Sequence, residues 1–291
     1  MPIEQLIVLA IVQGITEFLP ISSQAHLILL RMLFEPEAGV DAVEVGVTID
    51  VALHVGSLLA VLIYFARETR DAVVGPFTLI GDIRARRALR APSKLALLLV
   101  IATIPALAFG LALELTDALE AVRGENALLV IGLTTVVFGA LLYISDRFFP
   151  EREERRLETW STGAAIWMGL AQAVALIPGV SRSGVCMTMG RFLGYGRVEA
   201  ARIAMLMAIP TILAAGGFKS LQLIGSGDLE LGRDAAIAAG LSFLSAYAAL
   251  AVMMRLLVSF SFTPYVIYRM FLGGGLLLAW GLTTHLAGGA P

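Results

Sequence analysis

Long apolar runs separated by short polar segments dominate this chain. Six of the runs are long enough for a membrane-spanning helix, which needs about 20 mostly apolar residues. We expect these spans at residues 45–66, 95–115, 126–145, 199–217, 235–257 and 265–285. The pattern therefore predicts an all-α polytopic membrane protein with six transmembrane helices.

Two further apolar stretches are interrupted by a polar bend. Residues 3–34 are broken at 20–23, and residues 160–193 are broken at 178–183. A bend in lipid leaves backbone groups unpaired, so it must be buried in protein or line a wet cavity. We interpret both stretches as re-entrant helical hairpins.

The order of these elements repeats along the chain. A broken hairpin and three spans are followed, after a basic loop, by another broken hairpin and three spans. Because three is odd, the second half enters the membrane upside down. We expect a single integral membrane domain over residues 1–291, with inverted-repeat halves at about 1–150 and 151–291. Such repeats place their site near the midplane, where the breaks meet, which would bring Glu17 and His26 towards Arg182.

Basic residues in the polar segments orient the chain. Residues 67–94 hold seven basic and three acidic residues, and residues 146–159 contain four arginines. Residues 116–125 contain one arginine and three acidic residues. By the positive-inside rule, the first two segments are expected in the cytoplasm and residues 116–125 outside.

Composition supports the membrane interpretation and narrows the possible functions. Of 291 residues, 58% are hydrophobic and 15% are charged, whereas roughly 25% of residues in an ordinary globular chain are charged. A soluble domain would need more polar residues to cover its surface, so the composition argues against a soluble enzyme. The net charge of −2 argues against nucleic acid as a partner. A single cysteine, Cys186, excludes an internal disulfide.

The first hairpin carries a candidate catalytic carboxylate. Gln13 and Glu17 are four residues apart and therefore share one face of a helix. An ionisable group at membrane depth costs at least ~2.5 kcal/mol, so it usually faces a cavity or a partner. Glu17 is then a metal ligand or a proton acceptor. The alternative is a structural carboxylate bonded to nearby backbone N–H groups.

Hydroxyl and imidazole groups follow the first bend. Ser22 and Ser23 stand where a helix begins, so they could cap it or attack a phosphorus atom. His26 could act as general acid, general base or nucleophile, or could be a satisfied interior histidine. His54, close to Asp50, is equally compatible with packing and with a supporting role near the site.

The second hairpin has the residues of an anion site. Ser181, Arg182 and Ser183 follow Pro178 and a glycine, and a guanidinium can hold two phosphate oxygens at once. The alternative is an arginine that extends to the membrane interface. Together the two hairpins suit phosphoryl transfer from an amphiphilic phosphate ester. They would also suit a transporter or flippase of a lipid phosphate or another anion.

At these motifs the chain resembles the undecaprenyl-pyrophosphate phosphatase family, the bacitracin-resistance proteins. Segments 13–23, 55–60, 178–184 and 262–269 carry the resemblance, which covers essentially the whole chain. It implies hydrolysis of the terminal phosphate of a C55 isoprenyl pyrophosphate, which recycles the lipid carrier of peptidoglycan synthesis. It also implies a divalent cation (Mg²⁺ or Ca²⁺), a homodimer, and a site in the bacterial inner membrane that opens to the periplasmic side.

Residue by residue, the resemblance assigns roles to both hairpins. It implies that Glu17 is the metal ligand. It implies catalytic roles for Glu17, Ser23, His26 and Arg182, and phosphate binding by Gln13, Ser22, Ser181 and Ser183. The chain departs from the family at three places. Gln13 stands where many members have Glu, Gln24 and Ala25 replace the more usual Thr and Gly before the histidine, and Cys186 stands where the second motif normally ends in Thr.

Overall fold

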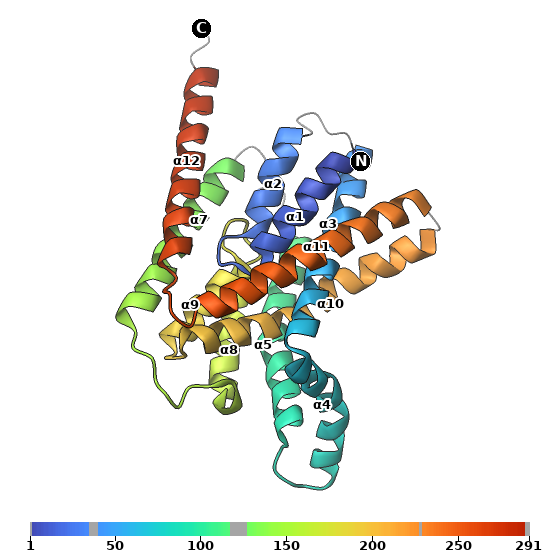
Figure 1. Cartoon of the computed structure of the whole chain (residues 1–291), viewed down its shortest axis with the longest axis vertical. Helices are drawn as coiled ribbons and strands as arrows, with labels where there is room; N and C mark the ends of the chain where they lie inside the picture. Colours follow the sequence, from blue (N-terminus) through green and yellow to red (C-terminus); the bar gives the residue numbers. More distant parts are fainter. Residues whose placement is uncertain (1, 35–39, 117–126, 227–228, 289–291) are drawn as a thin grey trace.

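The described part of the chain is helical throughout. The computed structural model describes residues 2–34, 40–116, 127–226 and 229–288, which form eleven α-helices and one short 3₁₀-helix. In chain order these are α1 (Ile3–Phe18), α2 (Ser23–Phe34), α3 (Val40–Tyr64), α4 (Ala66–Arg84), α5 (Ala91–Leu115), α7 (Ala127–Phe148), η1 (Leu157–Thr159), α8 (Thr162–Val174), α9 (Arg182–Phe192), α10 (Arg197–Ser226), α11 (Leu229–Leu256) and α12 (Thr263–Gly288) (Figure 1).

Several of these helices are long and apolar enough to cross a bilayer. Within the described residues, four qualify: Ala91–Leu113, Ala127–Phe148, Glu230–Leu256 and Thr263–Leu282. A fifth candidate is the pair Thr48–Tyr64 and Ala66–Arg84, whose helices are bent by 98°. The protein is therefore a multi-pass helical membrane protein, as the apolar pattern predicts.

The predicted count of six spans is not confirmed. A bent pair of helices occupies the place of the simple span expected at 45–66. The span expected at 199–217 falls within α10, whose first two turns carry Arg197, Glu199 and Arg202. These charges make the start of α10 less apolar than the four spanning candidates.

Both interrupted stretches form the expected pairs of short helices. Residues 19–22 separate α1 from α2, and residues 175–181 separate α8 from α9. The four helices have 16, 12, 13 and 11 residues, each fewer than the about 20 that a spanning helix needs. The two turns lie side by side near the centre of the molecule (Figure 1), where Ser183 Oγ donates to Leu19 O at 3.0 Å.

Helix α11 packs across α1 and α3 and brings them together (Figure 1). A Cβ atom at Gly14 of α1 would lie 1.9 Å from Ser245 Oγ, and one at Gly56 of α3 would lie 2.1 Å from Ala239 O. Glycine at both positions therefore permits an approach that any side chain would block. As a result, Glu17, which follows Gly14 by three residues, faces α3.

The basic segment 67–94, expected to be a loop, is mostly helical. Helix α4 runs alongside the first part of α5, and a short tip at residues 85–90 joins them (Figure 1). Arginines stand near both ends of α4, at Arg67, Arg70 and Arg84. They obscure the apolar periodicity of the helix between them, which explains why the sequence pattern suggests a loop.

The buried carboxylate of Asp82 anchors the tip between α4 and α5. Its Oδ1 accepts hydrogen bonds from Nε of Arg87 at 2.7 Å and Nε of Arg90 at 2.9 Å. Its Oδ2 accepts from Ser93 Oγ at 2.5 Å. One side chain thus connects the end of α4, the tip and the start of α5.

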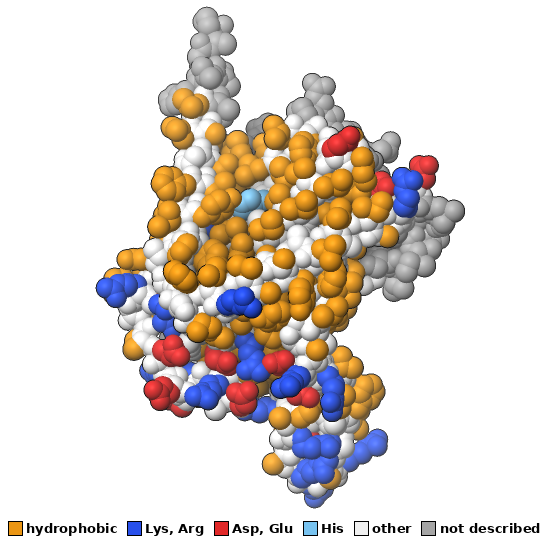
Figure 2. Space-filling view, in the orientation of Figure 1, with side chains coloured by type: hydrophobic (Ala, Val, Ile, Leu, Met, Phe, Trp, Pro, Cys, Tyr) orange, Lys and Arg blue, Asp and Glu red, His pale blue; other side chains and the backbone are white. Residues whose placement is uncertain are grey.

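The two basic segments lie at the same end of the molecule, as orientation by the positive-inside rule requires. Lys94 Nζ donates to Glu158 O at 2.9 Å, and the Arg202 guanidinium pairs with Glu68. Figure 2 shows Lys, Arg, Asp and Glu side chains gathered over the lower part of this face, with hydrophobic side chains over most of the upper part. The segment expected on the opposite side, 116–125, lies almost wholly outside the described residues.

Replacing Asp82 with Asn should loosen the tip between α4 and α5. The hydrogen bond from Ser93, with those from Arg90 and Arg87, holds the pKa of Asp82 well below its usual range. The stabilisation is therefore present at neutral pH and is lost only as the pH falls below the usual range of an Asp side chain. We expect trypsin to cleave the native Asp82→Asn variant after Arg87 several-fold faster than the wild type. Asp71→Asn, on the same helix, is the control, and equal cleavage of the two variants would contradict the anchoring role.

Candidate functional site

An ion pair joins the turns of the two hairpins. Glu17 lies near the end of α1 and Arg182 at the start of α9, and Arg182 Nη2 donates to Glu17 Oε1 at 2.7 Å. Both side chains are largely buried, with 5% of Glu17 and 14% of Arg182 exposed. The contact confirms the prediction that these two residues meet. Arg182 therefore points into the protein and does not extend to the membrane interface.

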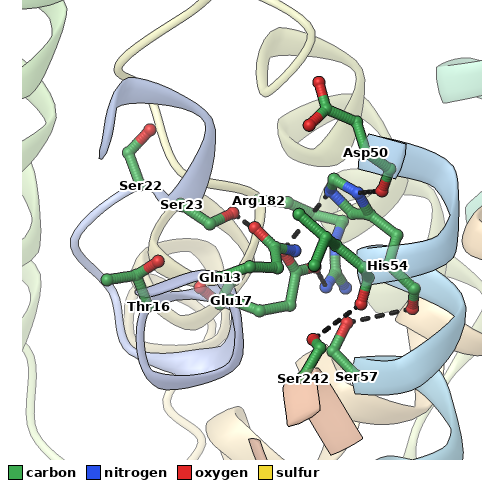
Figure 3. Close-up of polar contacts among 12 residues, drawn as sticks. Gln13, Thr16, Glu17, Ser22, Ser23, Asp50, His54, Ser57, Arg182 and Ser242 are labelled. Carbon is green, nitrogen blue, oxygen red and sulfur yellow. Dashed lines mark hydrogen bonds and ion pairs between the residues drawn. The ribbon is translucent and has the colours of Figure 1, made fainter. Parts of the chain in front are cut away.

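The second carboxylate oxygen of Glu17 is also held by the protein. Oε2 accepts hydrogen bonds from Gln13 Nε2 at 2.8 Å and from Ser23 Oγ at 2.7 Å (Figure 3). His54 Nε2, from α3, lies 3.6 Å from the same oxygen. Gln13 holds the carboxylate from within α1, while Ser23 and Arg182 approach from the turns. Glu17 is thus an oriented acceptor for the Ser23 proton.

A cavity of about 540 Å³ opens beside this pair. Its polar lining consists of Glu17, Ser22, Ser23, Gln24, Arg31, Asp50, His54, Ser181, Arg182 and Thr211. Its remaining lining is apolar or small and consists of Leu27, Ile28, Val51, Ala175, Leu176, Ile212 and Gly216. A lipid phosphate has the same division between a charged head and an apolar tail.

Arg182 keeps one nitrogen for a further partner. Its Nη1 atom is buried and has no hydrogen-bond partner within the described residues. Burying an unpaired guanidinium donor costs free energy, and phosphate oxygens are among its strongest partners. Arg182, which lines the cavity, therefore holds Glu17 through Nη2 while its Nη1 remains an unsatisfied donor.

Ser22 and Ser181 introduce the second helix of each hairpin in the same way. Both have a positive φ, 70° and 74°, which is uncommon for residues other than glycine. Ser22 Oγ accepts from the Ala25 N–H at 3.4 Å, and Ser181 Oγ accepts from the Gly184 N–H at 3.1 Å. Both serines also line the cavity. They thus combine helix capping with a position from which they can contact a phosphate.

Gln13 and Ser183, expected to bind phosphate, do not line the cavity. Gln13 is fully buried and donates to Glu17. Ser183 donates to Leu19 O, and its Oγ lies 3.2 Å from that of Ser181. Direct phosphate binding by these two residues stays a prediction that their positions outside the cavity lining do not support.

His26 lies towards α12, apart from the cavity lining. Its Nδ1 is 2.7 Å from Ser22 O, and its Nε2 is 2.6 Å from Tyr268 Oη. Its ring stacks on the Tyr268 ring with centroids 5.7 Å apart. The expectation that His26 would meet Arg182 is therefore not met, because the Ser22 carbonyl and the Tyr268 hydroxyl hold the imidazole elsewhere. A catalytic role for His26 stays a prediction that its position does not support.

Three further residues that line the cavity were not firmly predicted from the sequence. His54, left between packing and a supporting role, lines the cavity beside Glu17. Asp50 and Arg31 also line it, and Arg31 Nη2 contacts Asp50 Oδ1 at 2.6 Å. No sequence motif marks Asp50 or Arg31, because their proximity depends on how α2 packs beside α3.

Cys186, at a departure from the family pattern, lies in the hydrophobic core. It is fully buried and does not line the cavity. Thr188, two residues on, donates to Gly184 O at 2.8 Å within its own helix. The change from Thr to Cys therefore removes no side chain from the cavity lining.

The residues around Glu17 do not form a ready metal site. Among the described residues, no group of three or more His, Cys, Asp or Glu side chains could hold a metal ion. Both oxygens of Glu17 already accept hydrogen bonds, from Arg182 on one side and from Gln13 and Ser23 on the other. A cation at this site would need most of its ligands from another source.

Comparisons with known proteins agree with the motifs. A family model described as bacitracin resistance protein BacA matches residues 6–275. An undecaprenyl-diphosphatase from Jannaschia sp. (strain CCS1) is 52% identical over 94% of this chain and 97% of its own length. Relatives with the same name from Ruegeria sp. (strain TM1040) and Hahella chejuensis (strain KCTC 2396) are 48% and 41% identical, over 97% and 94% of this chain and 100% and 97% of their own lengths. The chain belongs to the bacitracin resistance protein BacA family.

Proposed function

We propose that this protein hydrolyses undecaprenyl diphosphate to undecaprenyl phosphate and inorganic phosphate, and so recycles the lipid carrier of peptidoglycan synthesis. The name of its relatives supports this substrate, since the match spans nearly their whole length. One observation in the structure carries the proposal. Arg182 holds Glu17 with one nitrogen and has a second, unpaired nitrogen beside a cavity that Ser23 also lines.

The contacts of Glu17 favour Ser23 as the nucleophile. Its hydroxyl already donates to Glu17 Oε2, so the proton can pass to the carboxylate as Ser23 Oγ attacks the terminal phosphorus. The bond from that phosphorus to the bridging oxygen then breaks, and undecaprenyl phosphate leaves. Arg182 stabilises the charge on the transferred phosphoryl oxygens.

Water completes the cycle. It attacks the phosphorus of phosphorylated Ser23, and the serine oxygen leaves as it takes back the proton held by Glu17. Water supplies the new oxygen of inorganic phosphate and releases one proton to the solvent. Glu17 therefore serves as base in the first step and as acid in the second.

The two turns support a proposal for the placement in the membrane. We propose that both hairpins are re-entrant, that the chain has six spans, and that the cavity opens to the periplasmic side of the bacterial inner membrane. The matching positive-φ serines at 22 and 181 support an inverted repeat, and the apolar cavity lining suits the start of the isoprenyl tail. The homodimer implied by the family resemblance is part of this proposal.

A divalent cation would arrive with the substrate. Mg²⁺ is commonly bound by one or two carboxylates together with substrate phosphates, and Glu17 and Asp50 both line the cavity. When bound, the cation would neutralise charge on the diphosphate. This arrangement fits the lack of a ready metal site among the described residues.

Removing Arg182 should abolish turnover without unfolding the protein. We expect Arg182→Ala to release phosphate from farnesyl or undecaprenyl diphosphate about 100- to 1,000-fold more slowly than the wild type, because a donor to the transition state is lost. The assay is run on purified protein in detergent, where no sealed compartment exists and a transporter would release no phosphate. Arg233→Ala, at an exposed position on α11, is the control. Normal turnover by Arg182→Ala would remove Arg182 from the site.

Ser23 and His26 should differ sharply when replaced. We expect Ser23→Ala to lose at least about 100-fold in kcat, because the attacking hydroxyl is gone. His26→Gln should stay within about tenfold of the wild type, because His26 does not line the cavity and general acid–base catalysis is not lost. Phosphate release measures both. A large loss in His26→Gln with an active Ser23→Ala would reverse the assignment.

Cation binding should depend on the diphosphate. We expect calorimetric titration of the protein with Mg²⁺ or Ca²⁺ alone to show no binding, because Glu17 is already occupied by protein donors. The same titration with a non-hydrolysable diphosphate present should show binding, which Glu17→Gln weakens. Tight binding of the cation to the protein alone would show that a resident site exists.

A further inference from the structure

Arg269 of α12 is a buried cation whose partners are backbone carbonyls. The residue is 0% exposed, and within the described residues its side chain has no carboxylate partner. Nε donates to Thr135 O at 3.0 Å, Nη1 donates to Pro20 O and Val180 O at 3.1 Å each, and Nη2 donates to Gly179 O at 3.0 Å, Val180 O at 3.1 Å and Thr134 O at 3.4 Å. A guanidinium has five N–H donors, so none remains for a substrate.

The carbonyls that Arg269 binds belong to both hairpin turns. Pro20 lies three residues before Ser23, and Val180 lies two residues before Arg182. Carbonyls in these turns have left the helical hydrogen-bond pattern, and at membrane depth they need partners within the protein. The other two acceptors, on α7, fix the guanidinium to a long helix. Arg269 therefore connects the nucleophile's turn, the phosphate-binding turn and α7.

Both turns hold backbone conformations that need outside support. Ser22 and Ser181 have φ values of 70° and 74°, and Gly179 has a φ of 90°. For residues other than glycine, such conformations are strained and persist only where surrounding contacts determine them. In the turns, the hydrogen bonds of Arg269 fall on one of these positions, Gly179, and on residues one or two before the serines, Val180 and Pro20.

We infer that Arg269 is a positioning residue for the proposed hydrolase. It fastens the two turns to each other, so that Ser23 and Arg182 keep the relative placement that attack on phosphorus requires. It acts through the backbone, since it is fully buried and does not line the cavity. The inference rests on the proposed function for its catalytic consequence, but the fastening of the turns can be measured without turnover.

Arg191 of α9 provides a matched control. It is also buried, with 4% exposure, and its guanidinium donates to the carbonyls of Tyr195, Asp146 and Phe149. None of these carbonyls belongs to either turn. Unlike Arg269, Arg191 also pairs with a carboxylate, since its Nε lies 3.2 Å from Asp146 Oδ1. If Arg269 only stabilised the fold, as any buried arginine can, changes at Arg191 and Arg269 would have the same effect on the site.

The experiment compares Arg269→Lys with Arg191→Lys. Lysine keeps the charge but lacks the planar fork that reaches several carbonyls. For Arg269→Lys we expect kcat to fall about 100-fold, the scale of a 1 Å misplacement of reacting groups, with KM within a few-fold of the wild type. Amide hydrogen exchange should rise at residues 19–23 and 178–182 together. Arg191→Lys should change neither kcat nor exchange at the turns.

Several results would overturn the inference. One is amide hydrogen exchange at the turns of Arg269→Lys that equals the wild-type rate, and another is faster exchange at only one of the two turns. A third is an equal effect of Arg269→Lys and Arg191→Lys on kcat and exchange. If Arg269→Lys does not fold, Gly139→Ala replaces it, because a Cβ there would lie 3.1 Å from Arg269 Cβ and 3.3 Å from its Nε. The same Cβ would lie 2.6 Å from Met270 Cε, at the flexible end of that side chain. The variant should raise exchange at both turns while Arg269 is retained. A folded wild type without turnover would instead contradict the proposed function, and the exchange data would still decide the role of Arg269.

Discussion

Backbone groups that leave a helix inside a membrane protein must find partners there, and this requirement determines how the two hairpins meet. The second hairpin satisfies part of the first turn, since Ser183 donates to Leu19 O, and α7 satisfies part of the second turn, since Thr134 donates to Pro178 O at 2.6 Å. Arg269 donates to further carbonyls of both turns, at Pro20, Gly179 and Val180. Side-chain hydrogen bonds to backbone carbonyls that lack a helical partner therefore join the hairpins. As a consequence, the side chains that follow each turn are brought together.

The same requirement shapes the charges of the site. A buried carboxylate or guanidinium is stable only with partners, and Glu17 and Arg182 supply each other with one. The pair leaves one guanidinium nitrogen unsatisfied, so the free site is already complementary to an additional anion. A phosphate bound by this guanidinium would leave the contact between Arg182 Nη2 and Glu17 Oε1 in place. Binding and proton transfer use different atoms of one small cluster.

The sequence predicts the hairpin turns from local signals, and it predicts the Glu17–Arg182 contact from the repeated order of the elements. A Pro-marked polar bend in an apolar stretch can only be buried at a site between elements, whatever the remaining helices do. The position of His54 beside Glu17 has no such signal. It depends on α11, which packs against Gly14 of α1 and Gly56 of α3, and neither contact follows from periodicity.

His26 illustrates a second limit of the sequence. Its place in the motif suggests that it shares the cavity with Ser23, but the direction of its imidazole is decided by two partners. One is the carbonyl of Ser22, four residues earlier, and the other is the hydroxyl of Tyr268 on α12. The Tyr268 contact joins residues 242 positions apart, so only the packing of α12 beside α2 reveals it.

Gln13 determines how the Glu17 carboxylate is held in this protein. An amide at this position donates to Glu17 Oε2 at 2.8 Å, so the carboxylate is held without a second charge nearby. The family resemblance places Glu here in many members, and two carboxylates this close would repel each other unless one took a proton or a cation lay between them. With Gln13 beside Glu17, neither a proton nor a cation is needed to offset repulsion. The substitution therefore accounts for a Glu17 that is fully held by protein donors before any cation or substrate enters the cavity.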